Sequence, residues 1–267
     1  MNIPVLNSIK IIEKQYDTGE LPVLVTCSDK NMYICKYMRS ATKAFKLASE
    51  LIGAQLAKIW EIESPKYAFV NIKQAHWVNI TTPHILSAPA FGYYKLDNIV
   101  DITPSTCKYI NQTSNLLTQL LKIALFDFWI ANEDRTYNNA NLLYDMQNHA
   151  LISIDYGGIF NTSTFEYPIT QLMSTDTILY ADIFQHLVKG KTADSVINMS
   201  LELKDDYERY IIKSQKDMDA ISRSIPTEWD VPANLIKKKL QQLTDKEWTE
   251  QVWSNFIENI NKNIGNE

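Results

Sequence analysis

The chain has 267 residues, 45% of them hydrophobic and 21% charged, which is enough to bury the core of one large or two small domains. Its seven glycines and nine prolines exclude a low-complexity or fibrous protein. The net charge of −5 argues against direct binding to a nucleic-acid backbone, because proteins that do so usually carry a basic face.

Cysteine usage and the N-terminal residues indicate where the protein works. Three cysteines in a chain of this length do not make a disulfide framework. The first residues lack the basic and apolar segments of a signal peptide, and no apolar run of about 18 residues follows that could span a membrane. We therefore expect a cytoplasmic protein without membrane contact.

The N-terminal segment is predicted to form β structure. Short apolar runs at 21–26 and 32–37 flank the polar residues 28–31. This is the pattern of two strands that are joined by a turn.

A change of period marks the next elements. From Ala41 to about Leu56, apolar residues recur at helical spacing with Glu50 inside the run, which predicts a helix. Residues 67–72 resemble a strand, whereas the prolines of segment 81–104 predict irregular structure.

The middle of the chain contains a strongly amphipathic segment. It predicts a helix over 114–130, with Thr113 or Ser114 as the N-terminal cap. The helix ends at the polar loop 132–135, and two short apolar runs then predict a β-hairpin between residues 142 and 154.

The remainder is predicted to be helical, with breaks near Pro226 and Pro232 and a capping box at 244–247. No internal repeat or long linker is present in the sequence. We therefore predict an α+β chain that forms a single domain over 1–267. Its small β-rich N-terminal lobe takes about residues 1–95, and its larger helical C-terminal lobe takes about residues 96–267.

Several polar residues stand where a phosphoryl-transfer site needs them. Lys36 ends an apolar strand, and Glu50 lies in the following helix. Asp134 opens a polar loop with Asn139 five residues later, and Asp155 ends a strand before two glycines. Transfer from ATP needs a lysine for the phosphates, a carboxylate for the acceptor hydroxyl, and Mg²⁺, which prefers oxygen ligands. Each residue alone is typical of an ordinary strand or turn, but together they follow the order found in kinases.

The same segments resemble a known family. Residues 132–143, Asn-Glu-Asp-Arg-Thr-Tyr-Asn-Asn-Ala-Asn-Leu-Leu, and 151–157, Leu-Ile-Ser-Ile-Asp-Tyr-Gly, resemble the catalytic and metal-binding segments of the HipA-like kinase family. More distantly they are similar to segments of the phosphoinositide kinases. Other similar features are Thr18-Gly19, the strand Tyr33 to Lys36, Glu50-Leu-Ile-Gly, Phe91-Gly92 and the Ile-Pro-x-x-Trp motif at 225–229. The resemblance covers most of the chain and implies a bilobal protein-kinase-like fold.

The resemblance implies ATP and Mg²⁺ as cofactors. Lys36 would be a catalytic residue that binds the α and β phosphates and pairs with Glu50. Thr18 and Gly19 would belong to the nucleotide site. The sequence shows no Gly-rich phosphate loop beyond these two residues, so it leaves the grip on the nucleotide undefined.

The resemblance also implies the roles of the two later segments. Asp134 would be the catalytic aspartate, and Asn139 and Asp155 would hold Mg²⁺. Asn141 is the alternative to Asn139, but the spacing of five residues after the aspartate favours Asn139, and Asn141 is expected to bond loop backbone. Arg135 either braces the loop by pairing with a nearby carboxylate or touches the substrate.

The strand before Asp155 predicts where this carboxylate points. Because Ile152 and Ile154 alternate with Ser153, Ile154 should face the core and Asp155 the cleft. The two glycines that follow should allow the backbone to turn away. Tyr156 stands where relatives often carry His.

Three functions are compatible with these residues. The leading hypothesis is a kinase of protein Ser/Thr hydroxyls, and the resemblance implies a bacterial toxin or defence role with an antitoxin-type partner. The second is a kinase of a small molecule or lipid headgroup, and the third is a nucleotide-binding pseudokinase. Retention of the lysine, both aspartates and Asn139 argues against the third. The segment 91–94 is either part of the acceptor surface or an aromatic hinge between the lobes.

Overall fold

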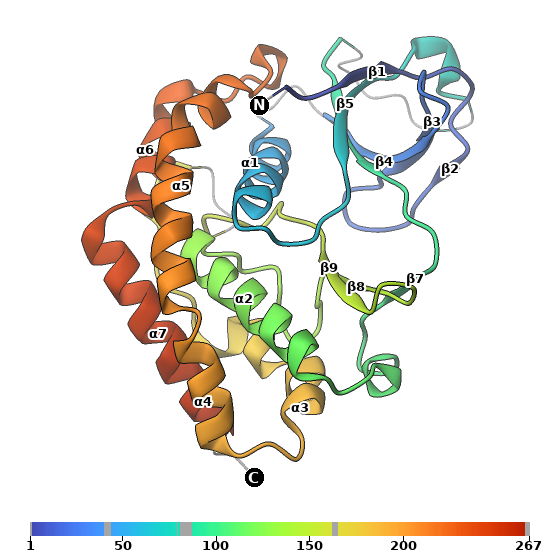
Figure 1. The fold of residues 1–267 in the computed structure, drawn as a ribbon. Coiled ribbons are helices and arrows are strands. Elements are labelled where there is room, and N and C mark those ends of the chain that lie inside the picture. The colour runs from blue at the N-terminus through green and yellow to red at the C-terminus, as the bar shows by residue number, and fades with distance from the viewer. Residues whose placement is uncertain (1, 40–43, 79, 81–86, 162–164, 265–267) are drawn as a thin grey trace.

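A six-stranded sheet and helix α1 form the β-rich N-terminal lobe (Figure 1). The computed structural model describes residues 2–39, 44–78, 80, 87–161 and 165–264. The sheet has the order β1-β5-β6-β4-β3-β2, in which β1 is parallel to β5 and the other neighbours are antiparallel. The elements are β1 (Val5–Asn7), β2 (Lys14–Gln15), β3 (Val23–Thr26), β4 (Met32–Lys36), α1 (Phe45–Ile59), β5 (Tyr67–Asn71) and β6 (Ala90–Tyr94).

The first predicted elements are confirmed. The runs at 21–26 and 32–37 form the hairpin of β3 and β4, in which Thr26 pairs with Met32. Helix α1 begins at Phe45, while its predicted start at Ala41 lies outside the described residues. All its residues from 47 to 57 are buried, because the helix lies between the sheet and the helical lobe.

The predicted irregular structure over 81–104 is wrong for β6 and for β7 (Ile99–Asp101), whereas residues 81–86 lie outside the described residues. The aromatic residues of β6 and the β-branched residues of β7 suit the pleated surface of a sheet, and this preference outweighs the nearby prolines. β6 lies between β4 and β5, and a Cβ on Gly92 would be 2.9 Å from a methyl carbon of Val70. Because Phe91 is fully buried in this strand and Tyr93 nearly so, neither offers an acceptor surface.

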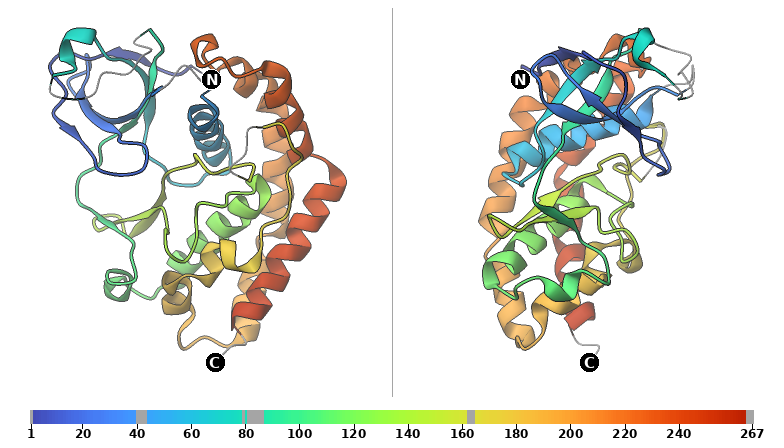
Figure 2. Two further views of the ribbon diagram at one scale, coloured as in Figure 1. Left: turned by 180° about the vertical axis from the view of Figure 1, so that it is seen from behind. Right: turned by 90° about the vertical axis from the view of Figure 1, so that its right-hand side faces the viewer.

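Helices dominate the C-terminal lobe, with a small sheet of order β7-β8-β9 beside α2 (Figure 2). The predicted helix over 114–130 is confirmed, and Thr113 Oγ1 caps it by accepting a hydrogen bond from the Leu116 N–H at 3.2 Å. The predicted hairpin is confirmed as β8 (Leu142–Asp145) and β9 (Ala150–Ser153). The α-helices are α2 (Ser114–Ile130), α3 (Asp182–Val188), α4 (Ala193–Leu201), α5 (Lys204–Arg223), α6 (Ala233–Leu243) and α7 (Lys246–Ile264). Short 3₁₀ helices are η1 (Gln74–His76), η2 (Cys107–Tyr109), η3 (Ser174–Asp176), η4 (Ile178–Tyr180) and η5 (Thr227–Trp229).

The predicted capping box at 244–247 is wrong. Thr244 ends α6, and its hydroxyl donates to the Gln241 carbonyl. Asp245 caps α7 instead, because its Oδ1 accepts the backbone N–H of Glu247 at 2.8 Å. The negative charge of aspartate at this position also interacts favourably with the positive end of the helix dipole.

Buried aromatic residues join α1 to the helical lobe. Trp60, directly after α1, stacks on Trp129 of α2 with ring centroids 4.9 Å apart. Trp229 donates through Nε1 to the Pro89 carbonyl at 2.8 Å, immediately before β6. The first contact fixes the end of α1 to α2, and the second joins the helical lobe directly to the sheet.

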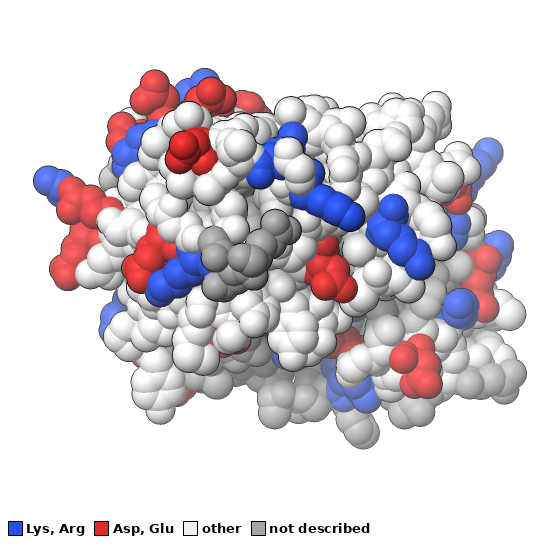
Figure 3. Space-filling view, turned by 90° about the horizontal axis from the view of Figure 1, so that it is seen from below, with Lys and Arg blue, Asp and Glu red and all other residues white. Residues whose placement is uncertain are grey.

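The surface shows no long-range separation of charge on the face drawn in Figure 3, where acidic and basic side chains are interspersed over a largely uncharged area. The three cysteines are free and buried. Within the described residues, no helix combines the length and apolar character needed to cross a membrane.

Candidate active site

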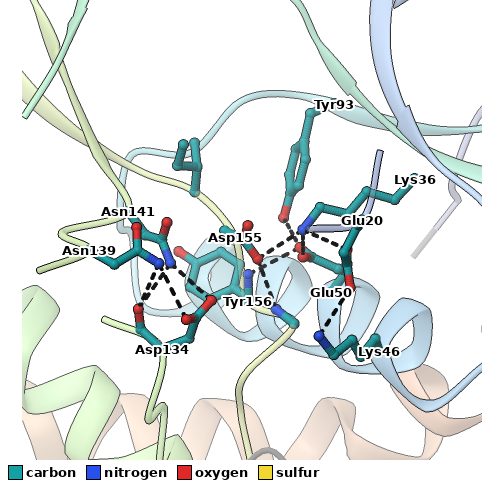
Figure 4. Close-up of polar contacts among 12 residues, drawn as sticks. Glu20, Lys36, Lys46, Glu50, Tyr93, Asp134, Asn139, Asn141, Asp155 and Tyr156 are labelled. Atoms are coloured by element: carbon teal, nitrogen blue, oxygen red, sulfur yellow. Dashed lines mark hydrogen bonds and ion pairs between the residues drawn. The ribbon is translucent and has the colours of Figure 1, made fainter. Parts of the chain in front are cut away.

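Lys36 ends β4 and meets carboxylates from three other parts of the chain (Figure 4). Its Nζ lies 2.8 Å from Asp155 Oδ1 and 3.2 Å from Glu20 Oε2. It also forms an ion pair with Glu50 of α1, so the structure brings together the strand lysine and the helix glutamate that the sequence singled out.

Glu50 is held from several sides although it is fully buried. Besides Lys36, the Tyr93 hydroxyl donates to its Oε2 at 3.3 Å, and the backbone N–H of Tyr156 donates to the same oxygen at 3.0 Å. One turn further along α1, Gly53 lets the helix approach Tyr156 closely, because a Cβ there would be 2.3 Å from the Tyr156 Cβ. The hydrogen bond and this close contact tie α1 to the turn that carries Asp155.

The charges of this group shift one another's pKa values. Burial lowers the pKa of Lys36, but the charges of Glu50, Asp155 and Glu20 outweigh burial and raise it, so Lys36 is cationic. Burial and the charge of Asp155 act to raise the pKa of Glu50, whereas the charge of Lys36 acts to lower it. Burial also acts to raise the pKa of Asp155, yet Lys36 and the hydrogen bonds at its carboxylate lower it to about 2. Asp155 therefore remains an anion beside the lysine.

Asp134 lies in the loop after α2 and is surrounded by amides rather than charges (Figure 4). Asn139 donates through Nδ2 to Asp134 Oδ1 at 3.2 Å, and Asn141 donates to Oδ2 at 3.3 Å. Both also donate to the Asp134 carbonyl, at 3.2 and 3.1 Å. Asn141 thus bonds loop backbone as expected, but both asparagines also orient the carboxylate.

Arg135 braces this loop from inside the protein. The side chain is fully buried, and its Nε donates to Asp127 Oδ2 at 2.7 Å. Its other nitrogens donate to Ser153 Oγ at 2.7 Å and to carbonyls of the loop, including that of Asn141. Of the two roles left open by the sequence, the geometry agrees with bracing, because a fully buried guanidinium cannot reach a substrate.

The turn at Asp155 differs from the expectation in its details. β9 ends at Ser153, which is fully buried and bonded to Arg135, while Ile154 is only half-buried. The simple alternation that would send Ile154 to the core is therefore wrong, because the chain leaves the strand before it. Asp155 itself takes the left-handed conformation with φ of 59°, a change of direction that the glycines were expected to make.

Gly158, the second glycine after Asp155, is needed for close packing instead. A Cβ on Gly158 would lie 2.5 Å from the Cβ of Asp134 and 3.2 Å from its backbone nitrogen. The Gly158 carbonyl also accepts the N–H of Glu133 at 3.2 Å. Gly158 thereby brings the Asp155 turn against the Asp134 loop, so that the two polar groups lie side by side with Tyr156 between them in Figure 4.

The donor set suits a hard cation such as Mg²⁺. The Asp155 side chain is 35% exposed beside Lys36, and Asn139 is exposed with its Nδ2 directed at Asp134, which leaves its amide oxygen for another partner. No hydrogen bond among the described residues joins Asn139 to Asp155. The described residues also contain no group of three or more His, Cys, Asp or Glu residues that could hold a metal ion. A cation here would therefore rest on Asp155, on amide oxygens and on the substrate.

Thr18 and Gly19 lie in the turn between β2 and β3, where the Thr18 carbonyl accepts the Leu21 N–H at 2.8 Å. The residue of this turn that contacts Lys36 is Glu20, which directly follows Gly19. Sequence reasoning missed Glu20, because an acidic residue in a turn has no distinctive pattern. Its position directly after Thr18-Gly19 was the available signal.

A β-rich lobe with a paired strand lysine and helix glutamate, next to a helical lobe with a loop aspartate, two asparagines and a second aspartate, is the architecture of protein-kinase-like phosphotransferases. The model of the HipA-like kinase family matches residues 9–256. The chain therefore belongs to the HipA-like kinase family, and phosphoryl transfer is its class of reaction.

The fold agrees with that of one solved kinase structure, to which we compare it first. The Helicobacter pylori proinflammatory kinase CtkA is similar over 98% of both chains, with a TM-score of 0.54 and 10% sequence identity. The Golgi casein kinase with Mn and ADP bound covers 97% of this chain with 75% of its own, at a TM-score of 0.46 and 9% identity. No curated protein matches the sequence significantly. At these identities the likeness to CtkA shows the fold alone.

Proposed function

We propose that this chain is an ATP- and Mg²⁺-dependent kinase that transfers the γ-phosphate to a hydroxyl group. The acceptor that we propose is the hydroxyl of a Ser or Thr residue in a protein. The carrying observation is that Lys36, paired with Glu50, lies beside Asp155, while a separately oriented carboxylate, Asp134, lies on the adjacent loop. A pure nucleotide binder has no need for this second carboxylate.

Each residue then has a defined task. Lys36 holds the nucleotide phosphates, and Glu50 fixes the position of Lys36. Asp134 orients the acceptor hydroxyl and accepts its proton, while its two asparagine donors keep the carboxylate aimed. Asp155 and Asn139 would hold Mg²⁺, which neutralises charge on the phosphate oxygens.

The finer assignments complete the proposal. The whole chain, 1–267, acts as one kinase domain whose lobes divide near residue 95. It works in the cytoplasm, where its buried free thiols stay reduced, as a toxin-type or defence-related kinase with an antitoxin-type partner. Thr18 and Gly19 contribute backbone to the nucleotide site.

Incubation of the purified chain with γ-labelled ATP and Mg²⁺, alone and with a cell extract, tests the proposal. We expect label on Ser or Thr of a protein, and its loss in Asp134→Asn. Label found only on an added small molecule or lipid would show that the acceptor is that molecule and not a protein. ATP that binds but stays intact would identify a pseudokinase, and absence of binding would overturn the kinase assignment.

A further inference from the structure

Lys36 and the carboxylates that contact it, Glu20, Glu50 and Asp155, are called the Lys36 group below. The proposed reaction gives no task to Glu20. It lies in the turn between β2 and β3, and its two carboxylate oxygens face different lysines. Oε2 is 3.2 Å from Lys36 Nζ, and Oε1 is 3.5 Å from Lys46 Nζ in the first turn of α1. A single carboxylate thus bridges the strand lysine and a second lysine of the helix (Figure 4).

The bridge lies at a cavity of about 330 Å³. Its walls are the Glu20 turn, the end of β4 and the start of α1. Lys36, Arg39 and Lys46 line it with Glu20 as the lone carboxylate among the lining residues. Arg39 is directed to the same turn, because its Nη1 donates to the Gly19 carbonyl at 3.3 Å. Three cations against one carboxylate make this cavity suited to a multiply charged anion.

The charges around Lys36 show which carboxylate can give way. A phosphate at Lys36 would meet Glu50, Asp155 and Glu20 at once, and like charges at such distances repel. Glu50 is fully buried and held by Tyr93 and by backbone, so it cannot leave without opening the core. Asp155 is the proposed ligand of the cation. Glu20, whose side chain is 27% exposed on a surface turn, can move at the lowest cost.

We propose that Arg39 and Lys46, together with Lys36, form the subsite for the terminal phosphates of the nucleotide, and that Glu20 occupies this subsite as an internal competitor. This inference rests on the proposed function, because it names the residues that grip the ATP phosphates. An incoming phosphate exchanges places with the Glu20 carboxylate. Arg39 then offers the planar pair of N–H donors that matches phosphate oxygens, and Lys46 a mobile charge.

Binding measurements on a graded set of probes test this arrangement. Isothermal titration of adenosine, ADP, ATP and tripolyphosphate, all with Mg²⁺, should be made on the wild type and on Glu20→Gln, Arg39→Gln and Lys46→Gln. Lys246→Gln and Glu250→Gln serve as matched controls, because this exposed pair lies on α7 with its charges 3.7 Å apart. Circular dichroism confirms that each variant is folded.

We expect Glu20→Gln to tighten ATP by up to roughly fivefold, the upper range for an exposed ion pair. Arg39→Gln and Lys46→Gln should weaken ATP and tripolyphosphate, ADP less, and adenosine not at all, while the α7 controls bind as the wild type does. Unchanged or weakened ATP binding in Glu20→Gln would contradict the proposal that Glu20 competes with the nucleotide phosphates for this subsite.

The proposed function and this subsite fail in different ways. If the wild type binds ATP but Arg39→Gln and Lys46→Gln leave the affinity for ATP unchanged, the subsite is wrong and the kinase assignment stands. If the wild type binds tripolyphosphate with the predicted variant dependence but neither adenosine nor ATP, the anion subsite stands and the nucleotide assignment is wrong. Binding of none of the four probes would overturn both.

Discussion

The Lys36 group and the Asp134 group, which consists of Asp134, Asn139 and Asn141, are held in position in different ways. Lys36 meets charged partners from a turn, from α1 and from the segment after β9, which are far apart in the sequence. Asp134 is oriented within its own loop by the neutral amides of Asn139 and Asn141. The first group therefore depends on how the elements pack, whereas the second is organised locally. Damage to packing and damage to the loop should have separable consequences.

The largest difference is expected between the two aspartates. Asp134→Asn should lower turnover by about 10²–10⁴-fold, because an orienting carboxylate acts on the acceptor. Its affinity for ATP should stay close to that of the wild type. Asp155→Ala should remove both turnover and the Mg²⁺-dependent part of ATP binding. Titration calorimetry beside a label-transfer assay separates the two effects, and equal loss of ATP binding in both variants would erase the proposed division of roles.

Arg135 tests whether the Asp134 loop is held from inside. Arg135→Met leaves Asp127 as an unpaired buried carboxylate, since that ion pair is almost completely shielded from solvent. The free energy of unfolding should fall by about 3–5 kcal/mol, as measured by urea denaturation. Lys213→Met, which breaks an exposed pair with Glu61, should cost less than about 1 kcal/mol. Similar losses in the two variants would contradict the bracing role.

Gly158 tests the contact between the two groups. In Gly158→Ala the new methyl group would meet Asp134 at 2.5 Å, so the loop must shift. A displacement of about 1 Å at a reacting group costs on the order of 10²-fold in rate. Gly190→Ala is the control, because Gly190 lies between α3 and α4 and nothing lies within 4 Å of a Cβ there, so that only its φ of 78° is strained. Turnover measured at saturating ATP should fall in the first variant and persist in the second.

The smallest effects should separate the two asparagines. Asn139→Ala should raise the Mg²⁺ concentration for half-maximal activity, because its exposed amide oxygen is the proposed ligand. Asn141→Ala removes hydrogen bonds at a half-buried position and should mainly lower thermal stability, by about 1 kcal/mol. A magnesium titration with melting curves decides the assignment. A shifted Mg²⁺ requirement in Asn141→Ala alone would reverse it.

Local signals in the sequence predicted the locally organised parts well. The cap of α2 and the chain order of lysine, glutamate and aspartates could be read because each depends on residues close in sequence or on a motif. β6 was missed because the nearby prolines outweighed its aromatic residues in the prediction, and because its burial depends on the strands on both sides of it. Glu20 was missed for the second reason, since its meaning depends on Lys36 and Lys46, which only the fold brings near.

The close approach of α1 to Tyr156 limits which substitutions are tolerated at position 53. A Cβ on residue 53 would collide with the Cβ of residue 156, not with the far end of the ring. Every amino acid except glycine at 156 carries that atom, so exchanging the phenol for an imidazole relieves nothing. Position 53 must therefore stay glycine as long as residue 156 keeps a side chain, whichever ring that side chain carries.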